Sequence, residues 1–332
     1  MNFWRMLRSI AINLGVDESA RTAIVQARMV GERIRRVAGW RPLPSDAIVL
    51  SGSGRSGTTW MADLLCSGTQ VQQIFEPLHP VGVPEVQRLL GWDESRHPHI
   101  RSRYIRPGAL CPEWKALLEK ILCGEVRNYW TDYDRTAFFP DRYLVKLIRA
   151  NLMLGFISDE FRPKIIHVVR SPCAVVASRL KYGWHADIRD VLDQEELVTD
   201  HLSDHVDDIA RENDALGAHA VWWAVENAIA QRDLESRPHL VVYYEVFRKN
   251  PKAEMRRIAE FAGLKMREIG ATRLERPSRM RERPAELQSQ TGVEPRREAQ
   301  LTAGEQARIL DWADRLGVRR DQEFSGTSAH VG

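Results

Sequence analysis

Apolar runs alternate with amphipathic segments along most of this chain. The runs predict five β-strands, at residues 47–51, 71–75, 143–148, 164–169 and 240–244. Four of them are almost continuously apolar, which is typical of parallel strands that helices cover on both faces. The segments between them predict helices at about 58–67, 150–160, 172–183, 215–235 and 251–262, and the capping box Thr302-Ala-Gly-Glu305 predicts a last helix that ends near 316. The alternation indicates an α/β fold, a doubly wound parallel sheet whose site lies where the strands end.

Some stretches lack this periodicity and set the domain organisation. We interpret two as irregular inserts and a third, rich in Arg, Glu and Pro, as a loop near the site or partly disordered chain; they are 79–140, 184–214 and 273–298. A Pro-rich break precedes the first strand. We therefore expect three parts, namely a basic helical extension over 1–44, a single α/β domain over 45–322 and a disordered tail over 323–332.

Composition narrows the class of protein. The 332 residues are 43% hydrophobic and 28% charged, as in soluble globular proteins. The net charge of +3 is too small to indicate nucleic-acid binding. No apolar run reaches the roughly 18 residues of a membrane span, and the N-terminus lacks the apolar core of a secretory signal. We therefore expect a cytoplasmic protein, and the spacing of its four cysteines favours free thiols over zinc ligands or disulfides.

The N-terminal residues 1–41 are basic, with eight Arg against three acidic residues. As a helix, this segment gathers apolar side chains on one face, namely Phe3, Trp4, Leu7, Ile10, Ala11 and Leu14. Such a helix packs on its own domain or lies on a membrane surface. Peripheral membrane contact through residues 1–40 is thus one of two hypotheses.

The most informative segment follows the first predicted strand. Gly52 and Gly57 have the G-x-x-x-x-G spacing of a phosphate-binding loop, and a helix is predicted to begin directly afterwards. Backbone N–H groups and the positive end of a helix dipole bind phosphate in this geometry. A nucleoside triphosphatase needs Lys after the second glycine, but Thr58 stands there, and Arg55 is the only cation in the loop. The sequence predicts a P-loop-type fold whose loop lacks the lysine for β- and γ-phosphates.

A second anion-binding signal follows the predicted strand 164–169. Arg170 stands at the strand end, and Ser178 lies two turns along the next helix. An Arg fork and a hydroxyl together suit a phosphate monoester. A structural ion pair is the competing interpretation of this strand-Arg-helix pattern. If Arg170 and Ser178 do bind an anion, they and the first loop together indicate a ligand with two separated phosphate groups.

These segments resemble the two nucleotide-binding motifs of sulfotransferases. Arg55-Ser-Gly-Thr-Thr-Trp60 resembles the 5′-phosphosulfate loop, and the segment 168–179 resembles the 3′-phosphate motif. Phe75-Glu-Pro-Leu78 and Leu144-Val-Lys-Leu-Ile-Arg149 resemble later segments of carbohydrate sulfotransferases. Arg55, where cytosolic relatives have Lys, is similar to the carbohydrate and tyrosylprotein branches. Ser171 and Cys173 depart from the commonest residues of the 3′ motif.

The resemblance implies a co-substrate, 3′-phosphoadenosine-5′-phosphosulfate (PAPS), and no catalytic metal. It implies that PAPS is bound by the first loop and the 3′ motif, through Arg55, Ser56, Gly57, Thr58, Thr59, Trp60, Arg170 and Ser178. Tyr244 would shape the nucleotide pocket, and Arg279, Arg281 or Arg283 is a candidate to close over the 3′-phosphate.

Four residues are candidates for the chemistry. Arg55 would cradle the leaving phosphate and neutralise the sulfonyl oxygens, beside the bridging oxygen. Glu76 follows the second predicted strand, where a carboxylate can take the proton of an acceptor hydroxyl, as the matching Glu of the tyrosylprotein branch does. His79 is its rival, although a loop histidine more often has a binding role. Lys146 lies near the end of an apolar strand, where a cation needs an anion, and we assign it to the sulfonyl group. The alternative for Lys146 is a side chain that extends to the sheet edge.

The sequence therefore predicts a PAPS-dependent O-sulfotransferase that works by in-line displacement. The FEPL segment favours a carbohydrate or glycoconjugate acceptor. A lipid, lipid-linked, small-alcohol or tyrosyl acceptor stays open. The more distant alternatives are a P-loop kinase and a nucleotide-binding protein without activity.

Overall fold

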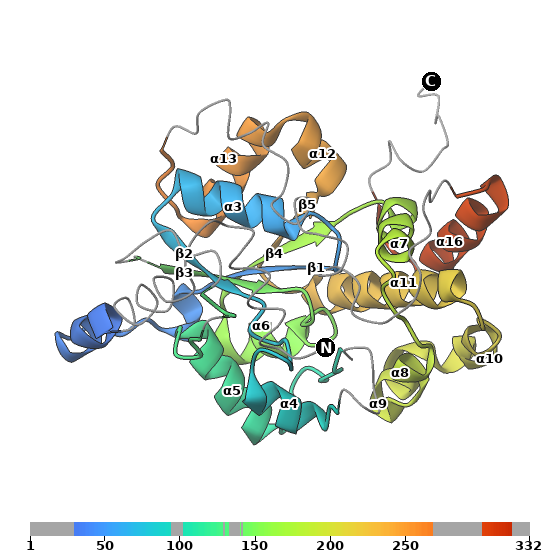
Figure 1. Ribbon diagram of the computed structural model, residues 1–332, viewed down its shortest axis with the longest axis horizontal. Coiled ribbons are helices and arrows are strands. Elements are labelled where there is room, and N and C mark those ends of the chain that lie inside the picture. Colours follow the sequence, from blue (N-terminus) through green and yellow to red (C-terminus); the bar gives the residue numbers. More distant parts are fainter. Residues whose placement is uncertain are drawn as a thin grey trace.

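The protein is built on one parallel five-stranded sheet, seen in a computed structural model that describes residues 30–93, 102–128, 130–132, 140, 142–267 and 301–320. The strand order is β2-β3-β1-β4-β5, and every neighbouring pair is parallel (Figure 1). The strands are β1 Ile48–Gly52, β2 Val71–Phe75, β3 Arg142–Leu147, β4 Lys164–Val169 and β5 His239–Tyr243. The predicted doubly wound sheet is confirmed.

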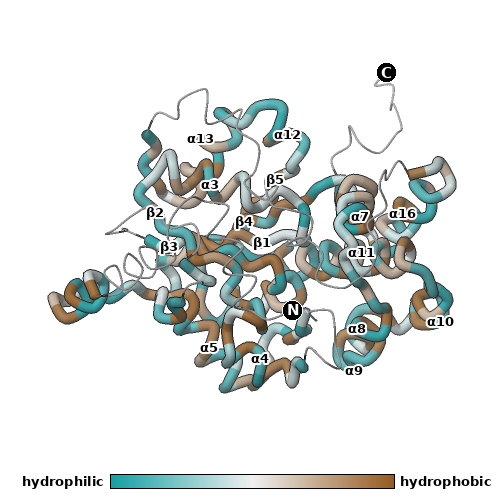
Figure 2. Tube along the Cα trace, in the orientation of Figure 1, coloured by the Kyte–Doolittle hydropathy of each residue, from teal (hydrophilic) through white to brown (hydrophobic). Residues whose placement is uncertain are grey.

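Alternate side chains of the strands enter separate cores on the two faces of the sheet. In β1, Ile48 and Leu50 pack with helices α3 (Thr58–Gly68) and α13 (Pro251–Ala262). Val49 points the other way, into the core between the sheet and the helices α5 (Pro112–Leu122) and α6 (Leu154–Phe161). This follows from the two-residue period of a strand. Figure 1 shows α3, α12 (Tyr244–Lys249) and α13 above the sheet and α5 and α6 below it, and in Figure 2 the central strands are largely hydrophobic.

A third core forms beside the end of β4. It joins α7 (Pro172–Lys181), the long α11 (Ala215–Leu234) and α16 (Ala303–Arg315). The predicted capping box is present, because the Thr302 hydroxyl accepts from the Glu305 N–H and the Glu305 carboxylate accepts from the Thr302 N–H. Almost all of α11 is buried, including Trp222 and Trp223. Within the described ranges, no helix combines the length and the apolar character that crossing a membrane would require.

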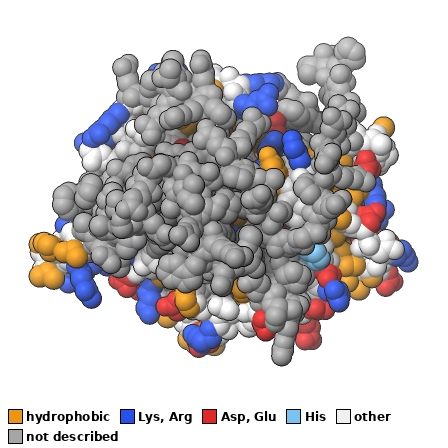
Figure 3. Space-filling view, viewed as in Figure 1, with side chains coloured by type: hydrophobic (Ala, Val, Ile, Leu, Met, Phe, Trp, Pro, Cys, Tyr) orange, Lys and Arg blue, Asp and Glu red, His pale blue; other side chains and the backbone are white. Residues whose placement is uncertain are grey.

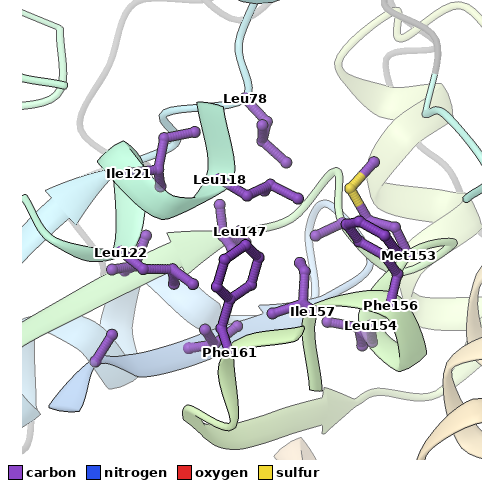
Figure 4. Packing of buried hydrophobic residues seen from close by; sticks show 14 of the residues in the cluster. Leu78, Leu118, Ile121, Leu122, Leu147, Met153, Leu154, Phe156, Ile157 and Phe161 are labelled. Atoms are coloured by element: carbon purple, nitrogen blue, oxygen red, sulfur yellow. The ribbon is translucent and has the colours of Figure 1, made fainter. Parts of the chain in front are cut away.

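Both inserts contain helices. The first holds α4 (Pro84–Leu90) and α5, whose Leu118, Ile121 and Leu122 pack in one core with Leu147 of β3 and Phe161 of α6 (Figure 4). The second is a chain of short helices, namely α8 Arg189–Leu192, α9 Glu195–Leu197, the π-helix η2 Val198–Leu202, η3 Ser203–His205 and α10 Val206–Ala210.

Several predicted boundaries differ from the observed ones by one or more residues, and two of these differences bear on the site. The helix expected from residue 150 begins at Leu154, because Asn151 instead turns its side chain back to accept a hydrogen bond from the Gly52 N–H at 3.1 Å. Tyr244, expected to end the last strand, begins α12. A short 3-10 turn, η1 (Pro44–Asp46), leads from the predicted Pro-rich break into β1. The expected apolar face of residues 3–14, the loop 273–298 and the tail 323–332 lie outside the described residues.

Two leucines test how much of the stability comes from this packing. Leu118 is completely buried under the sheet, whereas Leu110 is 97% exposed. Leu118→Ala should lower the free energy of unfolding by about 2–5 kcal/mol, because it leaves a cavity. Leu110→Ala should change it by less than about 0.5 kcal/mol. Urea unfolding followed by circular dichroism measures both variants, and equal losses would contradict the assignment of the core.

Candidate functional site

The glycine-rich loop joins β1, the central strand, to α3. Gly57 has φ +88° and is the residue before the helix. A Cβ atom at Gly57 would lie 2.2 Å from the ring of Tyr244, so this close turn needs glycine. No side chain of the described residues caps the N-terminus of α3. Its first N–H groups and its dipole are therefore available to an anion.

Ser56 supports the interpretation of this loop as an anion cradle. Its hydroxyl is buried and has no hydrogen-bond partner within the described part of the chain. Buried polar atoms are nearly always paired. An orphaned donor next to an uncapped helix start fits a phosphate-like ligand.

A buried polar network under the loop fixes its shape. The Ser53 hydroxyl donates to a carboxylate oxygen of Glu226 on α11 at 2.9 Å, and Arg179 donates to the same oxygen at 3.0 Å. The Arg179 Nε also donates to the Gly54 carbonyl at 3.3 Å. Because Arg179 and Glu226 are each almost fully buried, removal of either would leave an unpaired charge in the interior. The sequence predicted neither role, since nothing in the spacing links residues 53, 179 and 226.

The second anion-binding signal lies directly beside the loop. The Arg55 Nε donates to the Ser178 hydroxyl at 3.0 Å, and an Arg170 guanidinium nitrogen donates to the Arg55 carbonyl at 2.8 Å. Arg55 has φ +79° and lies over the Tyr182 ring, 4.3 Å from its centre. The structure thus places Arg55 against the 3′ motif, whereas the sequence-based prediction placed it beside the 5′ phosphosulfate. Tyr182 was not predicted.

Tyr244 contacts both halves of the site. Its ring lies against Gly57, and the Arg170 guanidinium lies 4.6 Å from the ring centre. Trp60 meets Tyr244 edge to face, with 6.2 Å between ring centroids, and packs on Phe247 as well. The next residue, Glu245, accepts the Ser171 N–H at 3.0 Å. The first turn of α12, directly after β5, therefore holds the start of α7, directly after β4, in place.

Lys146 and Glu76 form a buried ion pair at the ends of β3 and β2. The Lys146 Nζ donates to Glu76 Oε1 and to the Thr59 hydroxyl, each at 2.8 Å. Its side chain is only 2% exposed, so it does not extend to solvent at the sheet edge. Arg149 donates to the other oxygen of Glu76 at 2.8 Å. Arg149 belongs to the predicted strand motif, but no role could be assigned to it from the sequence.

The electrostatics of Glu76 follow from this double pairing. Burial alone would raise the pKa of its carboxyl, but Lys146 and Arg149, with a smaller contribution from His79, hold that pKa far below its usual value. Burial, and then Arg149, also lowers the pKa of His79 well below its usual value. At neutral pH, Glu76 is therefore an anion and His79 is uncharged.

Trp130 holds the turn that carries these two residues. Its indole N–H donates to the Glu76 carbonyl at 3.1 Å, and its ring lies 4.5 Å from that of His79 and 5.3 Å from that of Phe75. Glu76 itself has φ +40°, an uncommon conformation for a residue other than glycine. Trp130 lies in the irregular insert, so the sequence offered no signal for this contact.

The predicted site residues thus gather at the C-terminal ends of the strands in two adjoining groups. One contains Lys146, Glu76 and Thr59, and the other contains Arg55, Arg170 and Ser178. Arg279, Arg281 and Arg283 lie outside the described residues. Within the described ranges, no three His, Cys, Asp or Glu side chains are grouped as metal ligands.

Comparison with solved structures gives matches to sulfotransferases. The chain is 16% identical to the sulfotransferase from Alicyclobacillus acidocaldarius, with 83% of this chain and 96% of that chain covered and a TM-score of 0.40. The sulfotransferase domain from the curacin biosynthetic pathway is 12% identical, with coverages of 82% and 98% and a TM-score of 0.38. Mouse sulfotransferase SULT7A1, solved with PAP, is 14% identical, with coverages of 82% and 83% and a TM-score of 0.36. TM-scores this low carry no weight in the argument.

A comparison with curated proteins finds no match. The family assignment rests instead on a sequence match. The family model described as "Sulfotransferase family" matches residues 47–268, from the start of β1 to beyond α13. This range is more than half of the chain and includes both groups of the site. The chain belongs to the sulfotransferase family.

Proposed function

We propose that this sulfotransferase moves the sulfonyl group of PAPS to an acceptor hydroxyl. The observation that carries the proposal is that two anion-binding features meet at the C-terminal ends of the strands. One is the uncapped start of α3 with the orphaned Ser56 hydroxyl, and the other is the group of Arg55, Arg170 and Ser178. A 5′-phosphosulfate and a 3′-phosphate would match these features in number and in charge.

Different residues would bind the two phosphates and the sulfonyl group of PAPS. The N–H groups of Gly57, Thr58 and Thr59 would hold the 5′-phosphate together with the hydroxyls of Thr58 and Thr59, whereas the Ser56 N–H donates to the Ser53 carbonyl at 3.0 Å. Arg170 and Ser178 would hold the 3′-phosphate. When bound, PAPS supplies a sulfonyl group on a phosphate leaving group of low basicity. Lys146, which is paired with Glu76 and buried beside Thr59, would stabilise the sulfonyl oxygens. Positioning and fixed positive charge would then supply most of the catalysis.

We assign the removal of the acceptor proton to Glu76. Its two cation partners make it a weak base as the structure stands, because they favour its ionised form. An anionic donor that shares Lys146 would weaken this pairing and raise the pKa of Glu76 toward the range of an effective general base. His79 is less suited to the role, since its ring is buried against Trp130.

We further propose a carbohydrate or glycoconjugate acceptor. The support is the resemblance of the segment Phe75 to Leu78 to carbohydrate sulfotransferases. The three tryptophans of the first insert that the structure describes add no support, because Trp92 and Trp130 are buried and Trp114 packs against the core under the sheet. Incubation with labelled PAPS and a panel of glycans, tyrosyl peptides, lipids and small alcohols tests the acceptor. Label in any other class, with none in glycans, would overturn the carbohydrate proposal.

The two-phosphate cradle predicts how Arg170 contributes to binding. Arg170→Ala should weaken the binding of 3′,5′-adenosine bisphosphate, measured by calorimetry without metal, by roughly 10- to 100-fold, since a charge-assisted hydrogen bond is lost. Arg211→Ala is the matched control, because Arg211 is exposed and pairs only with Asp208 among the contacts described. Binding of ATP with magnesium, but not of the bisphosphate, would instead favour a P-loop kinase.

The role of Glu76 predicts a separation of binding from turnover. Glu76→Gln should keep bisphosphate binding and lose about 10²–10⁴-fold in turnover, as expected when a general base is removed. His79→Gln, the comparison variant, should lose less than about tenfold. Unchanged turnover in Glu76→Gln would exclude Glu76 as the base, and a large loss confined to His79→Gln would transfer the role to His79.

The ion pair also predicts a dependence of stability on pH. At pH 7, Glu76→Gln should lower the free energy of unfolding by about 3 kcal/mol, because it leaves buried cations unpaired. The exposed pair of Arg88 and Glu113 gives the control, and Glu113→Gln should cost less than about 1 kcal/mol.

The advantage of the wild type should shrink as the pH falls below 4.5, the ordinary pKa of the Glu76 carboxyl. The folded-state pKa is lowered, so below this pH the unfolded chain takes up the proton first, and the stabilisation is lost toward the lower folded-state pKa. Urea unfolding at a series of pH values measures the difference. A difference between wild type and Glu76→Gln that stays constant from pH 7 to pH 3 would contradict the ion pair.

A further inference from the structure

The helix over residues 30–37 is attached to the protein by its polar side. Glu32 is only 4% exposed and accepts from Arg127 at 3.0 Å. Arg35 donates to the Pro140 carbonyl at 2.8 Å, and Arg36 donates to the Cys123 carbonyl at 2.6 Å. A surface helix normally packs with its apolar side and shows its polar side to water. This helix has the opposite orientation.

The outward side of the helix is apolar. Val30, Ile34 and Val37 are 57%, 64% and 87% exposed, and their spacing places them on one face. Leu43, in the segment that leads to β1, is 57% exposed. The described residues contain five exposed large hydrophobic side chains, and these four are among them. The helix projects at the left of Figure 1, and Figure 3 shows hydrophobic side chains at that end next to basic ones.

Positive charge surrounds this apolar face. Residues 30–43 contain four Arg and one acidic residue, Glu32, which gives a net charge of +3. Arg33 and Arg41 are exposed, and Arg33 lies next to Val30 and Val37 around the helix. Apolar side chains rimmed by Arg are typical of segments that lie on anionic membrane surfaces.

We propose that the face formed by Val30, Ile34, Val37 and Leu43 docks on the surface of an anionic phospholipid bilayer. Four side chains would enter the boundary between headgroups and acyl chains, and Arg33 and Arg41 would lie among the phosphates. A second copy of the chain fits this face less well. The four side chains offer on the order of 400 Å² of apolar surface, about half of what one partner of a standard protein interface buries. A two-fold symmetric contact would also bring like-charged Arg33 side chains together.

Docking here would leave the sulfotransferase site clear. The segment that carries Leu43 enters β1 at its first residue, and Arg142, at the start of β3, donates to the Asp46 carbonyl. The face therefore lies at the beginning of the strands, whereas Glu76 and Lys146 lie at their ends. Changes in this face should not alter turnover of a soluble acceptor, so the proposal is independent of the acceptor and of the catalytic roles.

Vesicle flotation of the full chain tests the proposal. The wild type should float with vesicles of phosphatidylcholine containing about one third phosphatidylglycerol, less so at high salt, and not with phosphatidylcholine alone. Ile34→Gln/Val37→Gln should bind at least about tenfold more weakly, because two apolar side chains no longer enter the bilayer. Leu110→Gln, which changes an exposed leucine elsewhere, should bind like the wild type. Unfolding curves should coincide for all three proteins, since the changed residues are exposed.

Three results would overturn the proposal. They are a wild type that does not float with anionic vesicles, a double variant that floats as well as the wild type, and an equal loss of binding in Leu110→Gln. Light scattering provides a separate comparison. A concentration-dependent dimer that the double variant abolishes, together with no vesicle binding, would assign the face to a second copy of the chain.

Discussion

The buried charge of Lys146 is the constraint on which the arrangement of the site depends. An ammonium group inside a sheet is costly unless anionic and polar atoms surround it. Glu76 and the Thr59 hydroxyl meet this need, and they come from the end of β2 and the start of α3. One cation on β3 thus ties together the start of α3 and the end of β2, whose contacting residues lie 87 and 70 residues before it. A substrate anion that shared Lys146, as we propose for the sulfonyl group, would act on all three elements and would couple its binding to the ionisation of Glu76.

The two groups of residues that we propose to bind the phosphates are also connected through the loop backbone. Arg170 holds the Arg55 carbonyl, while the Arg55 side chain reaches Ser178. The loop therefore cannot change conformation without moving a residue of the 3′ motif. The buried pair of Arg179 and Glu226 anchors the same loop from below. A nucleotide would meet a site whose two halves are already in register, so little binding energy would be spent on ordering it.

The sequence predicted those features that depend on local pattern. Strand periodicity, helix caps and the glycine spacing predicted the sheet, the confirmed capping box and the position of the loop. The partners of buried charges could not be predicted, because Glu226 meets Ser53 and Arg179 only after the chain folds. The same limit explains why Arg149 and Trp130 were not assigned to Glu76. Arg55 shows the limit most clearly, since the motif located the residue but not the direction of its side chain.

The two ends of the parallel strands carry different features. The residues to which we assign the chemistry lie where the strands end, because loops there present the N-termini of α3 and α7 and the side chains that follow β2 and β3. The beginnings of the strands have no such role, and there the helix 30–37 buries Glu32 against Arg127. Burying an ion pair gains little stability compared with burying valine and isoleucine. A helix that buries its charges and exposes its aliphatic side chains is therefore poorly explained by the stability of the isolated protein, and it is better explained by a contact made at that face.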